Sequence, residues 1–173
     1  MALIDYFGGL YQLGYVTKDM DRATAFLQKK LGAGPFTVNQ FELAGDFRGK
    51  KRDLAIRVAQ GNVGAHQIEV IQPISGAVDH YLDGVDYERS VVTFHHVALV
   101  VPGPYAAWTD MLRQVRAGGD EFTIILEATE NPAFQVCFAY VDTRPHLGHY
   151  TEYLWWSVGA ETGNKHVANL SAS

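Results

Sequence analysis

Two segments of the chain carry apolar residues at the spacing of an amphipathic helix. They run from about Asp19 to Leu31 and from about Tyr105 to Ala117, and a short apolar strand precedes each. Asp19 is the expected N-cap of the first helix. Gly32 and Gly118 are expected to end the two helices in the left-handed conformation. Each helix should pack its apolar face on a sheet.

Three strands are predicted after each helix, separated by turn clusters rich in Gly, Asn, Asp and Pro. In the first half they are Phe36–Glu42, Leu54–Gln60 and Gln67–Gln72, and in the second half Phe122–Ala128, Gln135–Asp142 and Tyr150–Ser157.

The two halves repeat one pattern. Residues from Gln12 onward align without gaps on those from His96 onward, so that Ala23 coincides with Ala107. The repeat predicts an α+β fold of two βαβββ modules, related by a pseudo-twofold axis, whose curved mixed sheets surround a shared cleft.

The predicted division of the chain places a first module at 8–76, a linker at 77–93, a second module at 94–158 and a polar C-terminal tail at 159–173. Within the linker, HYLDGV is expected to form a helical turn.

Alternation along the strands selects four polar side chains for the face opposite the helices. They occupy the first and last strands of each module: Gln12 and Glu69, then His96 and Glu152. If the modules pair about the axis, the four side chains converge. A Gln, a His and two carboxylates suit a hard or borderline divalent ion, which leaves Zn, Ni, Co, Mn and Mg as candidates and Fe less favoured.

The same alternation turns Tyr11 and His95 toward the helices, and the small residues Gly14 and Ala98 are expected to leave room for a ligand. An unpaired carboxylate in an apolar strand is costly, so a metal ion is a good reason for the two glutamates. The amide of Gln12 is equally able to hydrogen-bond a neighbouring strand.

The composition and charge of the chain indicate what kind of molecule it binds. The chain has 14 basic and 19 acidic residues and a formal charge of −5, which argues against binding nucleic acid or an anionic membrane. No apolar run reaches the roughly 20 residues of a membrane span, and the N-terminus lacks the features of a signal peptide, so a cytoplasmic protein with a small-molecule partner is expected. The single cysteine, Cys137, lies in an apolar strand and is expected to be structural.

The double βαβββ pattern and the segments 11–36, 66–73, 94–101 and 148–154 resemble the vicinal-oxygen-chelate superfamily, which includes glyoxalase I, methylmalonyl-CoA epimerase, extradiol dioxygenases and bleomycin-resistance proteins. In that superfamily the metal ligands occupy the first and last strands of each module. The order Gln, Glu, His, Glu is similar to the ligand set of eukaryotic-type glyoxalase I and less similar to that of methylmalonyl-CoA epimerase.

The resemblance implies a homodimeric, metal-dependent isomerase, epimerase or lyase that polarises a substrate carbonyl and stabilises an enediolate. Glu152 is the expected general base, with Glu69 as ligand or second base. His149 and Tyr150 beside the last ligand, and Arg48 and Arg52 in a basic turn, are candidate substrate contacts. A solvated hairpin tip is the favoured interpretation of the turn, and an ordinary loop residue that of His149.

Two alternatives remain open at this point. An extradiol dioxygenase binds iron through two histidines and one glutamate, but Gln12 stands where the first histidine is expected. A metal-free binding protein of the bleomycin-resistance type is the other. Metal content of the purified protein separates it from the enzyme.

Overall fold

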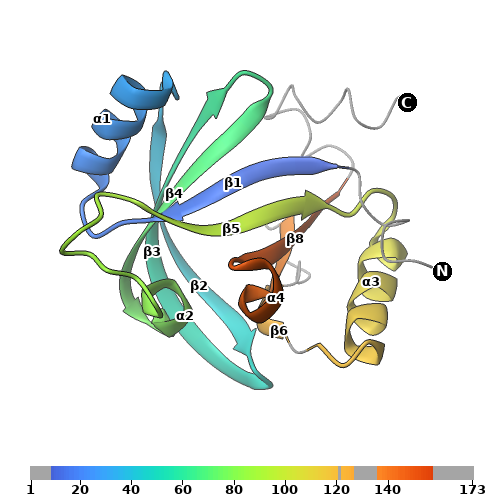
Figure 1. Ribbon diagram of the computed structural model, residues 1–173. Helices are drawn as coiled ribbons and strands as arrows, with labels where there is room; N and C mark the ends of the chain where they lie inside the picture. Colours follow the sequence, from blue (N-terminus) through green and yellow to red (C-terminus); the bar gives the residue numbers. More distant parts are fainter. Residues whose placement is uncertain (1–8, 121, 127–135, 158–173) are drawn as a thin grey trace.

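The computed structural model describes residues 9–120, 122–126 and 136–157 (Figure 1). The first half contains β1 (Leu10–Val16), α1 (Met20–Leu31), β2 (Thr37–Phe47), β3 (Lys50–Val63) and β4 (His66–Gly76), and the linker contains α2 (Asp79–Leu82). The second half contains β5 (Thr93–Val100), α3 (Tyr105–Ala117), β6 (Phe122–Leu126), β7 (Val136–Val141), α4 (Arg144–Leu147) and β8 (Tyr150–Trp156).

The strands form one closed barrel in the order β1-β4-β3-β2-β6-β7-β8-β5. The sheet is mixed, because β1–β4 and β5–β8 are parallel pairs while the others are antiparallel. The halves meet at β1–β5 along most of the strand, and at β2–β6 through Asp46 and Ile125, the one pair found there among the described residues. The predicted α+β fold of two βαβββ modules is confirmed.

Both long helices lie outside the barrel (Figure 1). α1 packs Met20, Ala23 and Leu27 against buried residues of β3 and β4 that include Ile68 and Val70. α3 packs a larger set against β6, β7 and β8: Trp108, Met111, Leu112 and Val115 contact Phe122, Cys137, Ala139, Val141, Tyr153 and Trp155. Fully burying a side chain of this size stabilises the fold by roughly 1.5–3 kcal/mol, so these faces anchor the helices. Cys137 is a buried thiol within the cluster packed under α3.

The first helix begins and ends as predicted. Asp19 accepts a hydrogen bond from the backbone N–H of Arg22, and Gly32 is left-handed with φ 67°. Gly118 ends α3 as predicted, but the predicted left-handed conformation is wrong, because its φ is −74° and Gly119 is the residue with a left-handed φ of 93°.

The predicted alternation fails at His95. Gly14 pairs with His96 while the next residue, Tyr15, pairs with Phe94, so His95 is an extra residue in a β-bulge. Its ring stacks on Tyr150, inside the barrel, rather than facing either of the long helices α1 and α3. A bulge turns two successive side chains toward the same face, which alternation alone does not anticipate.

A second bulge affects Tyr11. Leu10 pairs with Leu99 and Gln12 with Ala98, which leaves Tyr11 as the extra residue of β1. Tyr11 therefore joins Gln12 in facing the interior, where its ring lies 5.2 Å from that of Trp156.

The hairpin of β2 and β3 is longer than predicted. Its strands continue through the polar stretch to a two-residue turn at Arg48 and Gly49, whose φ values of 49° and 80° fit a tight hairpin turn. Phe47 and Leu54 are buried on the inner face, whereas Lys50 and its neighbours are exposed. Because the outer face of this part of the hairpin is polar, its strands were not recognised from the sequence.

The helical turn expected in the linker is present as α2, which buries His80 and Tyr81. No described helix is long and apolar enough to cross a membrane. The module boundaries stay a prediction, and parts of the strands expected at Phe122–Ala128 and Gln135–Asp142, with the tail at 159–173, lie outside the described residues.

Candidate metal centre

Gly14 lies at the centre of the site. It pairs with Glu69 of β4 on one side and with His96 of β5 on the other. A Cβ atom on Gly14 would lie 1.8 Å from Cε1 of His96, so the imidazole occupies the place of the missing side chain. The expectation that Gly14 leaves room for a ligand is therefore wrong, because that room holds His96 and brings it toward Glu69.

Glu152 approaches the same imidazole from β8. Nε2 of His96 lies 3.3 Å from Oε2 of Glu152 and 3.5 Å from Oε2 of Glu69. The ligand atoms of the three side chains lie within 4.8 Å of one another, and all three residues are buried. Two ligands about 2.1 Å from one ion are separated by about 3.0–3.4 Å, so this spacing fits a common cation.

Two atoms of the cluster, Nε2 of His96 and Oε2 of Glu152, are buried and have no hydrogen-bond partner among the described residues. They are close to each other but not aligned for a hydrogen bond. A buried polar atom left unsatisfied costs about 1–3 kcal/mol, and a cation between the two would remove that cost. The donor set, one imidazole nitrogen and carboxylate oxygens, thus fits a hard or borderline divalent ion.

The electrostatics of the cluster are strongly coupled. Burial disfavours a charged His96, but Glu152 and Glu69 outweigh it and raise the pKa of His96 to about 9. Burial also raises the pKa of Glu152, while His96 opposes that rise. Without a metal, a proton on His96 therefore partly balances the two carboxylates.

Further side chains support the carboxylates. Gln60 Nε2 donates to Oε1 of Glu69 at 3.2 Å. The hydroxyl of Tyr140 hydrogen-bonds Glu152, and burial raises the pKa of Tyr140 well above its usual range, so the hydroxyl remains a donor. Neither Gln60 nor Tyr140 was predicted from the sequence, although alternation with Val58 and with Phe138 places each on the inner face.

Gln12 lies on the wall of the same cavity as Glu69 and Glu152. Its side chain is buried, and Nε2 donates to Oε1 of Gln67 at 2.6 Å, the cross-strand bond weighed for this residue from the sequence. The amide oxygen of Gln12 is not used in this hydrogen bond and is the atom suited to binding a metal ion.

The cavity has a volume of about 540 Å³ and lies inside the barrel. Its polar wall is formed by Gln12, Gln60, Glu69 and Glu152, with Tyr81 and Tyr140 beside them. The other lining residues are apolar or aromatic: Tyr11, Phe41, Leu43, Ile56, Val58, Ile71, Val136, Phe138, Leu154 and Trp156. This is a site for a ligand with an apolar body and one polar end.

Residues 11–123 match the profile of the Glyoxalase/Bleomycin resistance protein/Dioxygenase superfamily. The chain belongs to this superfamily. The membership confirms the resemblance stated from the sequence.

Solved structures similar to this superfamily member include methylmalonyl-CoA epimerase from Mycobacterium tuberculosis (TM-score 0.55, 19% identity, 91% of this chain and 93% of that chain covered). A hypothetical protein from Bacillus halodurans is also similar (TM-score 0.53, 15% identity, 88% and 97% covered). So is a variant methylmalonyl-CoA epimerase from Streptomyces coelicolor in complex with 2-nitronate-propionyl-CoA (TM-score 0.53, 15% identity, 88% and 96% covered). At these identities the likeness shows the fold alone. A search of curated proteins found no match.

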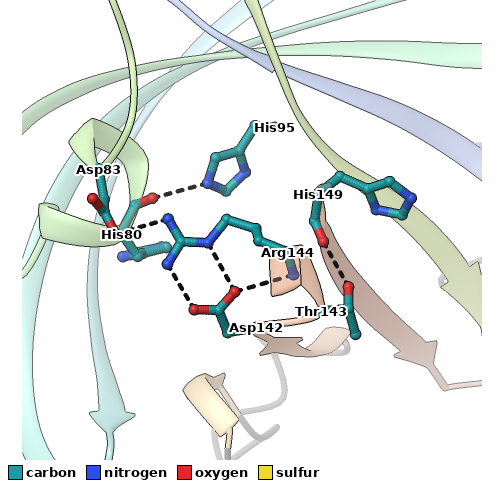
Figure 2. Close-up of polar contacts among 7 residues, drawn as sticks. All are labelled: His80, Asp83, His95, Asp142, Thr143, Arg144 and His149. Atoms are coloured by element: carbon teal, nitrogen blue, oxygen red, sulfur yellow. Dashed lines mark hydrogen bonds and ion pairs between the residues drawn. The ribbon is translucent and has the colours of Figure 1, made fainter. Parts of the chain in front are cut away.

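None of the four predicted substrate contacts of this superfamily member lines the cavity that Glu69 and Glu152 line, although Tyr150 pairs with His96 between β5 and β8. Arg48, Arg52 and Tyr150 line a second cavity, of about 370 Å³, and no described residue lines both cavities. His149 packs its ring 5.5 Å from that of Phe94, and its carbonyl accepts a bond from Thr143 (Figure 2). Their role in substrate binding stays a prediction.

Asp83, which lines the second cavity, belongs to a network of charges drawn in Figure 2. Arg144 donates to both carboxylate oxygens of Asp142 and to Asp83 at 2.7 Å, and its guanidinium lies 4.5 Å from the centre of the Tyr150 ring. These contacts hold α4 and the start of β8 against the linker.

Proposed function

We propose that this protein is a divalent-metal-dependent enzyme that abstracts a proton from the carbon next to a substrate carbonyl. The observation that carries the proposal is the buried group of Glu69, His96 and Glu152, whose two carboxylates line a largely apolar cavity. Membership of the superfamily supports it.

Glu69, His96 and Glu152 would hold the ion, with the amide oxygen of Gln12 as a fourth ligand. A zinc, nickel, cobalt, manganese or magnesium ion fits the donor set, and the bound ion supplies Lewis acidity toward a substrate carbonyl. Each glutamate has two carboxylate oxygens, so either glutamate can bind the ion through one oxygen and act as a base through the other.

Glu152 is the proposed general base. Burial raises its pKa, which brings a carboxylate closer to the range useful for proton transfer at neutral pH, and its Oε2 has no hydrogen-bond partner among the described residues. Glu69 faces the same imidazole from β4 and is the proposed second base. With one base the reaction is an isomerisation or lyase step, and with a base on each face of the carbon it is an epimerisation.

The substrate proposed for this site is a carbonyl compound with an apolar body that fills the cavity. CoA thioesters come first in a screen, because two of the similar structures are methylmalonyl-CoA epimerases. Hemithioacetals come second, because the order of the four proposed ligands is similar to that of glyoxalase I.

The test compares the parent protein with Glu152→Gln. Proton abstraction is read by NMR as exchange of the substrate C–H in D2O, and metal content by elemental analysis after growth with added metals. We expect a stoichiometric ion in both proteins and at least a hundredfold slower exchange in the variant, since a positioned general base contributes about 10²–10⁴ in rate. Glu42→Gln, at an exposed position of β2, is the matched control. Full exchange by Glu152→Gln would refute the assignment.

A metal-free binding protein is the second candidate, favoured by the apolar lining of the cavity. It predicts tight binding of apolar ligands to a protein that takes up no ion even after growth with added metals. A cytoplasmic location and a homodimer are further parts of the proposal, and light scattering on the eluting protein tests the dimer.

A further inference from the structure

His95 touches the proposed metal ligand directly. Its Nδ1 lies 3.0 Å from Nδ1 of His96. Its Nε2 lies 3.0 Å from the backbone carbonyl oxygen of His80, a contact drawn in Figure 2. Both imidazoles are buried. The three residues therefore form a chain of hydrogen bonds from α2 to the cluster.

The carbonyl at the end of this chain decides where the protons are. A carbonyl oxygen only accepts hydrogen bonds, so Nε2 of His95 must carry a hydrogen. No described carboxylate forms an ion pair with this buried ring, so the neutral form is favoured and Nδ1 of His95 is an acceptor. Nδ1 of His96 must then be the donor, which leaves the lone pair of a neutral His96 on Nε2.

We propose that His95 is a positioning residue that fixes His96 in the tautomer whose Nε2 lone pair faces Glu69 and Glu152. The proposal rests on the proposed function, since that nitrogen is the one offered to the ion. Hydrogen bonds from the far nitrogen of a ligating histidine commonly set its tautomer and orientation and raise its basicity as a ligand.

Separate parts of the fold position the residues of this series of hydrogen bonds. The bulge in β5 turns His95 into the barrel beside His96. The ring of Tyr150 stacks on His95 with centroids 4.7 Å apart and planes 27° apart, which fixes the plane of the imidazole. The short helix α2 presents the carbonyl of His80, so the linker between the halves takes part in arranging the site.

Zinc affinity of single variants tests the proposal. His95→Phe keeps a buried ring without an acceptor, and we expect zinc to bind about tenfold to a hundredfold more weakly. His95→Asn restores an acceptor close to the place of Nδ1 and is expected to recover most of the affinity. His80→Phe keeps the backbone carbonyl and changes only the side chain, so it is the matched control and should bind zinc like the parent. Parent-like affinity in His95→Phe would overturn the proposal.

Imidazole nitrogen NMR on the parent protein supplies a second readout that needs no variant to fold. With zinc, we expect hydrogens on Nε2 of His95 and on Nδ1 of His96. In the metal-free protein, we expect the same Nε2–H on His95. A hydrogen on Nδ1 of His95 in either state overturns the proposal. If the parent binds no ion at all, the proposed function fails, while the metal-free spectrum still decides the tautomer of His95.

Discussion

Gly14 and Ala98 occupy equivalent places in the two modules. They differ by one methyl group, and this difference decides which side chain can pack over each of them. The ring of His96 lies over Gly14, whereas Gln12 pairs beside Ala98, which in turn pairs with Glu152. Each first-strand ligand candidate thus neighbours the small residue of the other module. A ring needs the glycine, while an extended amide tolerates the alanine, which gives a steric reason for placing histidine in one module and glutamine in the other.

Gly14→Ala tests this packing. The new Cβ would lie 1.8 Å from Cε1 and 2.1 Å from Nε2 of His96, so the imidazole must leave its place. We expect destabilisation by about 1–3 kcal/mol in urea unfolding and a loss of zinc affinity of at least tenfold by calorimetry. Gly118→Ala, at the end of α3 where φ is −74°, is the control. Unchanged zinc binding in Gly14→Ala would contradict the proposed ligand role of His96.

At the scale of the element, the sequence predicts best where a single strand or helix determines its own pattern. Glu69 and Glu152 face the cavity because alternation is undisturbed around them, since the bulge of β4 lies farther along at Ile74 and β8 has none. The orientations of His95 and Tyr11 were predicted wrongly because their bulges arise from the register of β1 against β5. These strands lie about eighty residues apart in the chain. The register between two distant strands depends on how both strands pack, so it cannot be predicted from the residues of either strand alone.

The N-cap of α1 is a local feature and permits a quantitative prediction. Asp19→Ala removes the acceptor for the N–H of Arg22, a bond of 3.0 Å, and we expect a loss of about 1 kcal/mol in the free energy of unfolding. Asp19→Ser keeps an acceptor and should retain most of the stability. Equal losses in both variants would show that the charge of Asp19, and not its capping bond, stabilises the helix.

At the scale of the whole molecule, the barrel creates the cavity by closing. The repeat predicted two βαβββ modules around a shared space, but it did not predict that β2 and β6 meet to complete a ring. Closure through Asp46 and Ile125 follows from the long β2–β3 hairpin, whose polar outer face concealed its length. The apolar lining from Phe41 to Val58 therefore became a wall of the site only in three dimensions.

Closure also buries two histidines away from carboxylates. Burial lowers the pKa of His80 to about 3 and that of His95 well below its usual range. In the unfolded chain both gain a proton near pH 6.5, so below that pH the unfolded state binds more protons and stability is lost as the pH falls. His96 acts in the opposite sense, because its pKa of about 9 makes the stability it contributes present below pH 6.5 and lost as the pH rises through 9.

The metal-free protein should therefore be most stable near pH 6.5, and His80→Phe should weaken the loss on the acidic side. One such histidine changes the unfolding free energy by about 1.4 kcal/mol per pH unit between its two pKa values, so from pH 6.5 to 5 the parent should lose about 2 kcal/mol more than His80→Phe. Urea unfolding at both pH values measures the difference. His66→Phe, at an exposed position, is the control and should follow the parent. Parallel losses in the parent and His80→Phe would mean that His80 takes up its proton without unfolding, and that the barrel admits water to α2.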